Sequence, residues 1–271
     1  MNSSNQPIKY LIPSIAAAFS IALSVNSHAA LVGYWNFNEG TGTNANDFST
    51  NNNDGIISNG AAYTANAGGH TATVGDYAIV INGGSKYVRV PHSNSFASIT
   101  NQFTIAGWAY ENSNTNYGHI FATSSNGTDR NFLFQGDNSG GGDQVYVWSS
   151  TSTAWQKSQG WTIPSAQWMH WALTYDGTNL RSYRNGTLMS TKAISGGQSM
   201  PSFAGGNAYL GGWLAGNSSF GGLIDDMVIF NSVEDVASIS DGTHLAMVPE
   251  PSACALLGLG GLGLLLRRRR I

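Results

Sequence analysis

The sequence contains almost no cysteine and little charge. Cys254, close to the C-terminus, is the single cysteine among 271 residues. An internal disulfide framework and a cysteine-based zinc site are therefore excluded from the main part of the chain. Charged residues make up only 10% of the chain, the net charge is −3, and the basic residues before the last few positions are scattered singly. This distribution offers no basic surface for a nucleic acid, which we exclude as a partner.

Glutamate is also scarce, which bears on glycan hydrolysis. Retaining glycosidases need two carboxyl groups about 5 to 5.5 Å apart. None of the four glutamates lies in a carboxylate cluster; they are Glu39, Glu111, Glu234 and Glu250. Asp225 and Asp226 are adjacent, so on a regular strand their side chains would point to opposite faces and would not act as a close pair.

Other catalytic motifs are missing as well. The sequence has no Gly-x-Ser-x-Gly elbow, no His-Glu-x-x-His pair and no Walker loop in its central part. Its central histidines are scattered, and we interpret them as surface or half-buried strand residues; they are His70, His92, His119, His170 and His244. We therefore expect a protein that is not an enzyme.

Hydrophobic runs occur at the two ends of the chain. Lys9 precedes a mostly apolar stretch over residues 10–25, and the small residues around Ala29 follow it. This order predicts a cleavable secretion signal over residues 1–29, because a membrane-spanning helix needs roughly 20 apolar residues and carries no such site. The mature chain is expected to begin near Ala30, with a single domain over residues 30–246.

The C-terminal segment, residues 247–271, has three parts in a fixed order. Pro249, Glu250 and Pro251 precede an apolar run over residues 253–266. Four arginines close it: Arg267, Arg268, Arg269 and Arg270. The positive-inside bias keeps such a basic block in the cytoplasm and leaves the preceding domain outside. A helix of about 14 residues spans only about 21 Å, so we expect a transient hold in the inner membrane.

This tail resembles the PEP-CTERM sorting signal, in which the same three parts occur in the same order. The resemblance implies recognition by an exosortase in a Gram-negative bacterium. It also implies export, tethering to the inner membrane until sorting, and release into the cell envelope or an extracellular polysaccharide matrix. The alternative is a plain C-terminal membrane anchor, which also places the domain outside the cytoplasm.

The central part alternates apolar and polar residues with a period of two. Asp176-Gly177 and Asn185-Gly186 separate runs at 168–175, 180–184 and 187–191, and such dipeptides favour tight hairpins. Further strands are expected at 33–38, 77–82, 86–90, 103–110, 119–123, 131–135, 144–149, 208–212 and 222–231, and a helix at 233–240. Many short strands without helical periods predict an all-β sandwich of two antiparallel sheets.

Three segments of this part resemble concanavalin A-like, laminin-G-like jelly rolls. The opening run at 33–40 with the loop at 47–55, the hairpin at 171–186 and the closing run at 220–231 match that family in order. The resemblance implies a jelly-roll fold shared by lectins and glucanases. The sequence departs from the family pattern at Asp226, where a glutamate is usual, and at Phe48, where a small polar residue is usual.

The loop at 47–55 predicts a calcium site. It supplies two aspartates, three asparagines and backbone carbonyls, and calcium prefers such oxygen ligands. The resemblance implies that a carboxylate of the closing strand completes a structural calcium site. We therefore name Asp47 and Asp225 first, followed by Asn53 and Asp226. The alternative is that Asp47 and Asn53 only form turns through side-chain hydrogen bonds.

Tryptophans suggest a carbohydrate-binding surface, because sugar rings present apolar faces edged by hydroxyl groups. Trp148, on an expected strand, and Trp155 and Trp161, in loop-like sequence, lie among Ser, Thr, Gln and Gly and are the candidates. Ordinary loop packing is the alternative. The remaining strand tryptophans are expected in the core: Trp35, Trp108, Trp168 and Trp171.

Three functions remain open. The first is an exported, non-catalytic binding or matrix protein that associates with polysaccharide or another surface component. The second is a divergent glycan hydrolase or lyase on the same fold. The third is a purely structural component of the envelope or biofilm.

Overall fold

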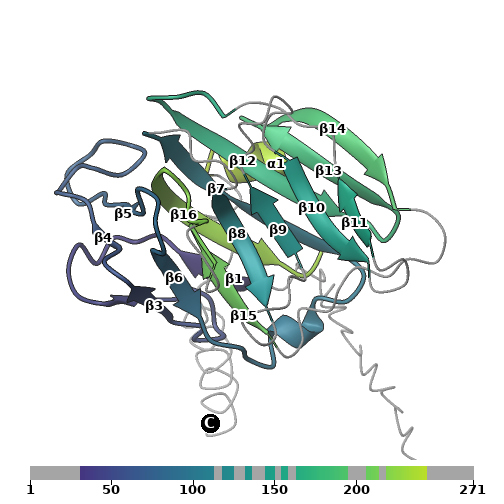
Figure 1. The fold of residues 1–271 in the computed structure, drawn as a ribbon, viewed down its shortest axis with the longest axis horizontal. Coiled ribbons are helices and arrows are strands. Elements are labelled where there is room, and N and C mark those ends of the chain that lie inside the picture. Colours follow the sequence, from purple (N-terminus) through teal and green to yellow (C-terminus); the bar gives the residue numbers. More distant parts are fainter. Residues whose placement is uncertain are drawn as a thin grey trace, which may run out of the picture.

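The computed structural model describes residues 31–112, 118–124, 132–135, 144–149, 154–157, 163–194, 206–213 and 218–242. These residues form two antiparallel sheets of eight strands each, stacked face to face (Figure 1). The predicted all-β sandwich is confirmed. The predicted secretion signal (1–29) and sorting helix (253–266) lie outside the described residues.

The first sheet is called sheet A. Seven of its strands follow one another in space, and the eighth, β1, pairs with β16. Its strands, in spatial order, are β14 (Thr187–Ala193), β13 (Asn179–Arg184), β12 (Trp168–Tyr175), β7 (Phe103–Glu111), β16 (Gly222–Phe230), β5 (Ile79–Val80) and β4 (Ala62–Tyr63), with β1 (Leu31–Trp35). The predicted hairpins are confirmed: β12 pairs with β13 and β13 with β14. Gly177 and Gly186 have φ of +91° and +74° in their turns, a conformation that glycine adopts without steric cost.

The second sheet, sheet B, covers the inner face of sheet A. Its strands are β11 (Ala154–Lys157), β10 (Gln144–Ser149), β9 (Phe132–Gln135), β8 (His119–Ser124), β15 (Asn207–Leu210), β6 (Tyr87–Val90), β3 (Gly55–Ser58) and β2 (Asn44–Ala45). Trp155 therefore lies on a strand, β11, and not in the loop that the sequence suggested.

The main core fills the space between the sheets. Trp35 and Trp171 are fully buried in it, as predicted, and the ring of Trp171 packs against Phe134 at a centroid distance of 4.9 Å. Alternation along β7 and β12 turns every second side chain to the outer face of sheet A. Trp108 and Trp168 are on that outer face and only half-buried, so their prediction as core residues is wrong.

A short helix covers one end of this outer face. Helix α1 (Val236–Ser240) begins three residues later than predicted, because the Asp235 side chain accepts a hydrogen bond from Ala237 N and caps it. A 3-10 turn (Phe96–Ser98) is the other helical element of the described residues. Val236 and Ile239 of α1 pack on outward-facing residues of β7, β12 and β16: Ala106, Ala172, Val228 and Phe230. We call these six residues the helix-covered end.

Candidate functional site

Asp47 organises the loop that follows β1. Its Oδ1 accepts hydrogen bonds from Tyr34 N and Ser49 N, each at 2.8 Å. Its Oδ2 accepts from Ser49 Oγ at 2.6 Å and from Asn53 N at 2.8 Å. Both carboxylate oxygens are therefore engaged by donors of the same loop and of β1, which is the turn-forming alternative that the sequence left open.

Asn53 fastens the same loop to the sandwich. Its Nδ2 donates to Val32 O at 2.7 Å and to Ser95 Oγ at 2.8 Å, and its backbone oxygen accepts from Trp35 Nε1 at 2.9 Å. Asn53 Oδ1 is buried without a hydrogen-bond partner among the described residues. Asn53 thus joins the loop to β1 and leaves one buried acceptor open.

The closing strand β16 carries the second pair of predicted ligands at a β-bulge. Asp225 lies opposite Trp108 and Val228 opposite Ala106, so β16 has one extra residue against β7 at this point. Asp226 adopts a positive φ of +44°. Regular alternation is therefore interrupted, and the prediction that Asp225 and Asp226 point to opposite faces is wrong.

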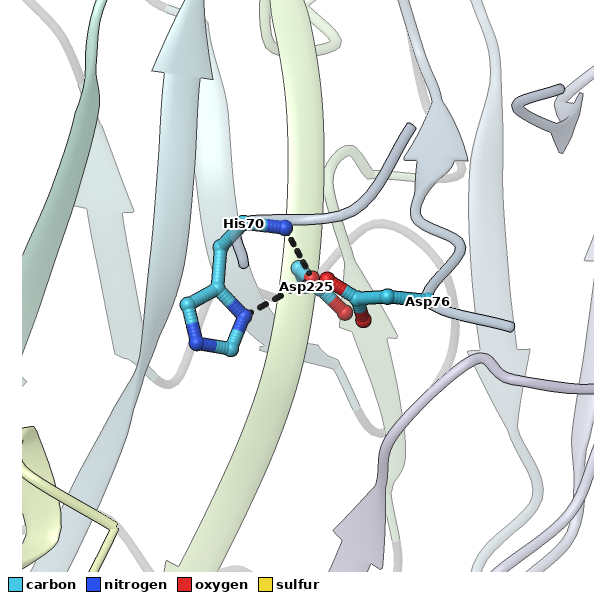
Figure 2. Close-up of side chains that lie close together, drawn as sticks. All are labelled: His70, Asp76 and Asp225. Carbon is cyan, nitrogen blue, oxygen red and sulfur yellow. Dashed lines mark hydrogen bonds and ion pairs between the residues drawn. The ribbon is translucent and has the colours of Figure 1, made fainter. Parts of the chain in front are cut away.

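Both aspartates contact one imidazole nitrogen. His70 Nδ1 lies 3.0 Å from Asp225 Oδ2 and 3.3 Å from Asp226 Oδ2. The backbone N–H of His70 also donates to Asp225 Oδ2, at 2.8 Å (Figure 2). Asp225 is fully buried, and its Oδ1 accepts from Asp226 N at 2.9 Å. His70 comes from the loop between β4 and β5, so the site joins segments that are 155 residues apart.

Asp76, from the same loop as His70, completes the cluster. One nitrogen or oxygen from each of His70, Asp76 and Asp225 lies within 4.8 Å of the others. Asp76 Oδ2 accepts from Thr71 N at 2.8 Å and from Thr71 Oγ1 at 2.5 Å, which fixes its orientation. We call His70, Asp76, Asp225 and Asp226 the His70 cluster.

Aromatic rings surround the His70 cluster on the outer face of sheet A. The imidazole of His70 stacks on the indole of Trp108, with centroids 4.5 Å apart and an interplanar angle of 14°. His170 meets the same indole edge to face at 5.3 Å, and Trp168 meets Tyr110 at 5.6 Å. The strand register places Asp225, Trp108 and His170 in one row across three strands.

Burial dominates the electrostatics of this face. Burial raises the pKa of Asp225 and of Asp226 above the ordinary range. Burial disfavours the charged form of His70, but the hydrogen bond to Asp225 and the neighbouring carboxylates outweigh it, so the pKa of His70 is raised. Burial, assisted by the charge of His70, lowers the pKa of His170 to about 4. His70 is thus the group on this face that favours a positive charge.

The four predicted calcium ligands divide between two places. Asp47 and Asn53 lie in the loop after β1, whereas Asp225 and Asp226 belong to the His70 cluster. Tyr34 links the two places, because its backbone N–H donates to Asp47 Oδ1 and its hydroxyl to Asp226 Oδ1, each at 2.8 Å. Both carboxylate oxygens of Asp47 accept hydrogen bonds within its loop and from β1, and a calcium ion held by these four residues stays a prediction.

His70 and Asp76 are not among the site residues predicted from the sequence. A weak signal was present, since Gly68 and Gly69 directly precede His70 and paired glycines often mark a close backbone approach. A β-carbon on Gly69 would lie 2.4 Å from the carboxyl carbon of Asp76. No short-range pattern, however, connects this loop with β16.

The predicted sugar-binding tryptophans are described only in part. The backbone register of β10 and β11 places Trp148 directly opposite Trp155. Trp161 lies outside the described residues. Within the described part of the chain, no helix has the length and apolar character needed to cross a membrane.

Solved structures of three carbohydrate- or receptor-binding proteins share the fold. Domain 4 of an extracellular arabinanase of Geobacillus stearothermophilus, solved with arabinotriose, matches with a TM-score of 0.59 and 22% identity, over 79% of this chain and 98% of that domain. Trypanosoma rangeli sialidase in complex with sialic acid matches with a TM-score of 0.56 and 14% identity, over 78% of this chain and 32% of the sialidase. The receptor binding domain of botulinum neurotoxin C/D mosaic serotype matches with a TM-score of 0.56 and 11% identity, over 79% of this chain and 51% of that domain.

The chain therefore spans about a third of the sialidase and half of the neurotoxin domain. No curated protein matches the chain.

Family models match two parts of the chain. The PEP-CTERM protein-sorting motif matches residues 248–270, and it indicates an exported surface protein that an exosortase-type system processes and sorts to the cell envelope of a Gram-negative bacterium. The model of the concanavalin A-like lectin/glucanase superfamily matches residues 82–240, which is more than half of the sequence. This protein belongs to the concanavalin A-like lectin/glucanase superfamily.

Proposed function

We propose that this exported surface protein is a non-catalytic binding protein whose sandwich associates with polysaccharide of the cell envelope or extracellular matrix. The pairing of Trp148 with Trp155 in the register of β10 and β11 carries the proposal. The two tryptophans are register partners on β10 and on the edge strand β11. Sugar rings stack on aromatic side chains, so such a pair offers a binding surface.

A related domain supports this proposal. The arabinanase domain, of which this chain covers 98%, was solved with arabinotriose. That domain is one part of a larger enzyme, so its fold accommodates an oligosaccharide as a separate unit. The sorting motif at 248–270 indicates export to the cell envelope, which is compatible with a polysaccharide partner.

The carboxylates argue for binding without catalysis. Most glycosidases use one carboxyl group as a proton donor and one as a base or nucleophile, both facing a bound sugar. Asp225 is fully buried, and its Oδ2 accepts two hydrogen bonds from His70. Asp226 accepts from the Tyr34 hydroxyl. Asp225 has no exposed oxygen with which to reach a bound sugar, and Asp226 is engaged by Tyr34 and His70.

Binding to a panel of immobilised polysaccharides tests the proposal. We expect the wild-type chain to be retained by at least one of them, and Trp148→Ala and Trp155→Ala each to weaken retention at least tenfold. Trp161→Ala tests the third predicted tryptophan in the same way. Phe48→Ala is the matched control, because Phe48 is an exposed aromatic residue in the loop after β1. Loss of binding in that control, or retention by no polysaccharide, would contradict the proposal.

An assay for reducing sugars and unsaturated products on the same panel tests the absence of catalysis. We expect no turnover by the wild-type chain. Turnover that Asp226→Asn abolishes, with polysaccharide binding intact, would instead establish the hydrolase or lyase alternative.

A further inference from the structure

The His70 cluster contains more negative than positive groups. Three carboxyl groups, of Asp76, Asp225 and Asp226, surround a single imidazole. Asp225 is 0% exposed and Asp76 is 7% exposed. Among the described residues, no arginine or lysine forms an ion pair with any of the three; the Arg181 ion pair is with Asp176, in another turn. A buried carboxylate is neutralised by a proton or by a compensating charge, and one imidazolium balances only one of these three groups.

We propose that His70, Asp76 and Asp225 form a binding site for a divalent transition metal ion of the zinc class. Such an ion would join the loop between β4 and β5 to the closing strand β16. The site differs from the predicted calcium set in its ligands, since it uses His70 and Asp76 in place of Asp47 and Asn53.

The spacing of the donor atoms agrees with this ion. Zinc binds imidazole nitrogen and carboxylate oxygen at about 2.0 to 2.2 Å, which places tetrahedral ligand atoms about 3.3 Å apart. His70 Nδ1 and Asp225 Oδ2 lie 3.0 Å apart, and one atom from each of the three residues lies within 4.8 Å of the others. Figure 2 shows His70 Nδ1 directed at Asp225, with the Asp76 carboxylate on the other side of Asp225. An ion here would take the place of the proton that His70 Nδ1 and Asp225 Oδ2 now share.

The imidazole decides between metals. Calcium takes oxygen ligands almost exclusively, whereas zinc and its neighbours bind imidazole together with carboxylate. With three ionised carboxylates and a neutral His70 the cluster carries a charge of −3, and a divalent ion makes it less negative, at −1. Asp226, whose Oδ2 lies 3.3 Å from His70 Nδ1, adds negative charge beside the ion.

The surroundings of the three ligands hold them in place. The indole of Trp108 stacks on His70, the hydroxyl and N–H of Thr71 bind Asp76, and Asp226 N binds the Oδ1 of Asp225. Contacts of this kind orient metal ligands and raise affinity in known metal sites. The ligands are therefore preorganised by contacts that an ion at this position would leave intact.

Metal titration of the full chain tests the proposal. The chain is purified in mild detergent without a histidine tag and is stripped with EDTA. Calorimetry with Zn²⁺ and with Ca²⁺ then measures affinity, and Co²⁺ reports the ligand geometry through its visible absorption. We expect one Zn²⁺ per chain, a higher melting temperature with Zn²⁺, and a tetrahedral Co²⁺ spectrum.

Variants locate the site. Removing a residue that only supports a metal ligand costs about 10- to 100-fold in affinity, so His70→Gln and Asp76→Asn should each weaken Zn²⁺ binding about 100-fold or more. Asp76→Asn keeps a carbonyl oxygen that can accept from Thr71, and its melting temperature without metal shows that it is folded. His92→Gln is the matched control, since His92 is exposed and lies outside the cluster.

Three results would overturn the proposal. The first is that the wild-type chain binds no Zn²⁺ and its melting temperature does not change. The second is that His70→Gln binds Zn²⁺ as tightly as the wild type. The third is that Ca²⁺ binds more tightly than Zn²⁺ and His70→Gln leaves this binding unchanged.

Discussion

The outer face of sheet A has two ends that are built from the same three strands in opposite ways. At the helix-covered end, Ala106, Ala172 and Val228 present small or branched apolar side chains, and α1 closes over them. At the other end, Trp108, His170 and Asp225 stand in one row under the His70 loop. The β-bulge at Asp226 separates the two ends.

The difference shows how one sheet can support two kinds of stability. Apolar burial at the helix-covered end does not depend on pH or on ions. Burial of carboxyl and imidazole groups at the other end depends on both, because each buried charge must be neutralised or paired. We expect substitutions and changes of pH to affect the two ends differently.

The largest expected effect is at the helix-covered end. Phe230→Ala removes a fully buried ring beneath α1 and should lower the free energy of unfolding by about 3 to 5 kcal/mol. Chemical denaturation at pH 5 and pH 8 measures it, and the loss should be equal at the two values. Val74→Ala is the control, because Val74 is 87% exposed and the change should stay within about 0.5 kcal/mol. If the free energy lost in Phe230→Ala differed between pH 5 and pH 8, the helix-covered end would not be independent of pH.

His170 should make the other end sensitive to acid. Its pKa is lowered to about 4 by burial, so the unfolded chain takes up a proton near pH 6.5 while the folded chain does not. Stability from this group is present above pH 6.5 and is lost as the pH falls toward 4. Between pH 7 and pH 5 the wild type should lose about 2 kcal/mol more than His170→Gln. Parallel curves for the two proteins would show that His170 is not buried in its neutral form.

Tyr34 belongs to both ends and should show an intermediate effect. Its ring packs against the helix-covered end and its hydroxyl donates to Asp226 Oδ1. Tyr34→Phe keeps the ring and should cost about 1 to 2 kcal/mol, because the partly buried carboxylate of Asp226 loses a donor. A double-mutant cycle with Asp226→Asn should give a coupling energy of about 1 kcal/mol. Additive effects would mean that the hydroxyl and Asp226 do not interact in solution.

The smallest expected effect concerns the cap of α1. Asp235 accepts a hydrogen bond from Ala237 N at 3.2 Å, and Asp235→Ala should cost about 1 kcal/mol. Asp235→Ser, which also caps helices, should restore most of the loss. Hydrogen exchange of the amides of α1 shows whether the effect stays local. Unchanged exchange in Asp235→Ala would mean that packing alone holds the helix.

Much of the fold could be predicted from local patterns. The strand at 168–175 coincides with β12, and the Asp-Gly and Asn-Gly turns that follow it are confirmed. The strand predicted at 33–38 runs from Leu31 to Trp35 and ends where Phe37 takes a φ of +55°, which no local pattern reveals. The two-residue strands β2 and β4 were too short to be seen.

The candidate site was much less predictable. Asp225 and Asp226 could be named from the closing strand, but the bulge that brings both to His70 depends on the opposite strand. Gly107 of β7 leaves room for Met227, since a β-carbon there would lie 2.5 Å from the Met227 sulfur atom. His70 reaches Asp225 across 155 residues, and contacts of this range arise from the packing of the sheets.

The pairing of β1 with β16 has a consequence for the order of folding during export. Leu31 lies in the first described strand, and its partner Phe230 lies in the last one. The pair can therefore form only after nearly the whole domain has crossed the membrane. If the chain leaves the membrane N-terminus first, sheet A is completed only shortly before the sorting motif at 248–270 follows.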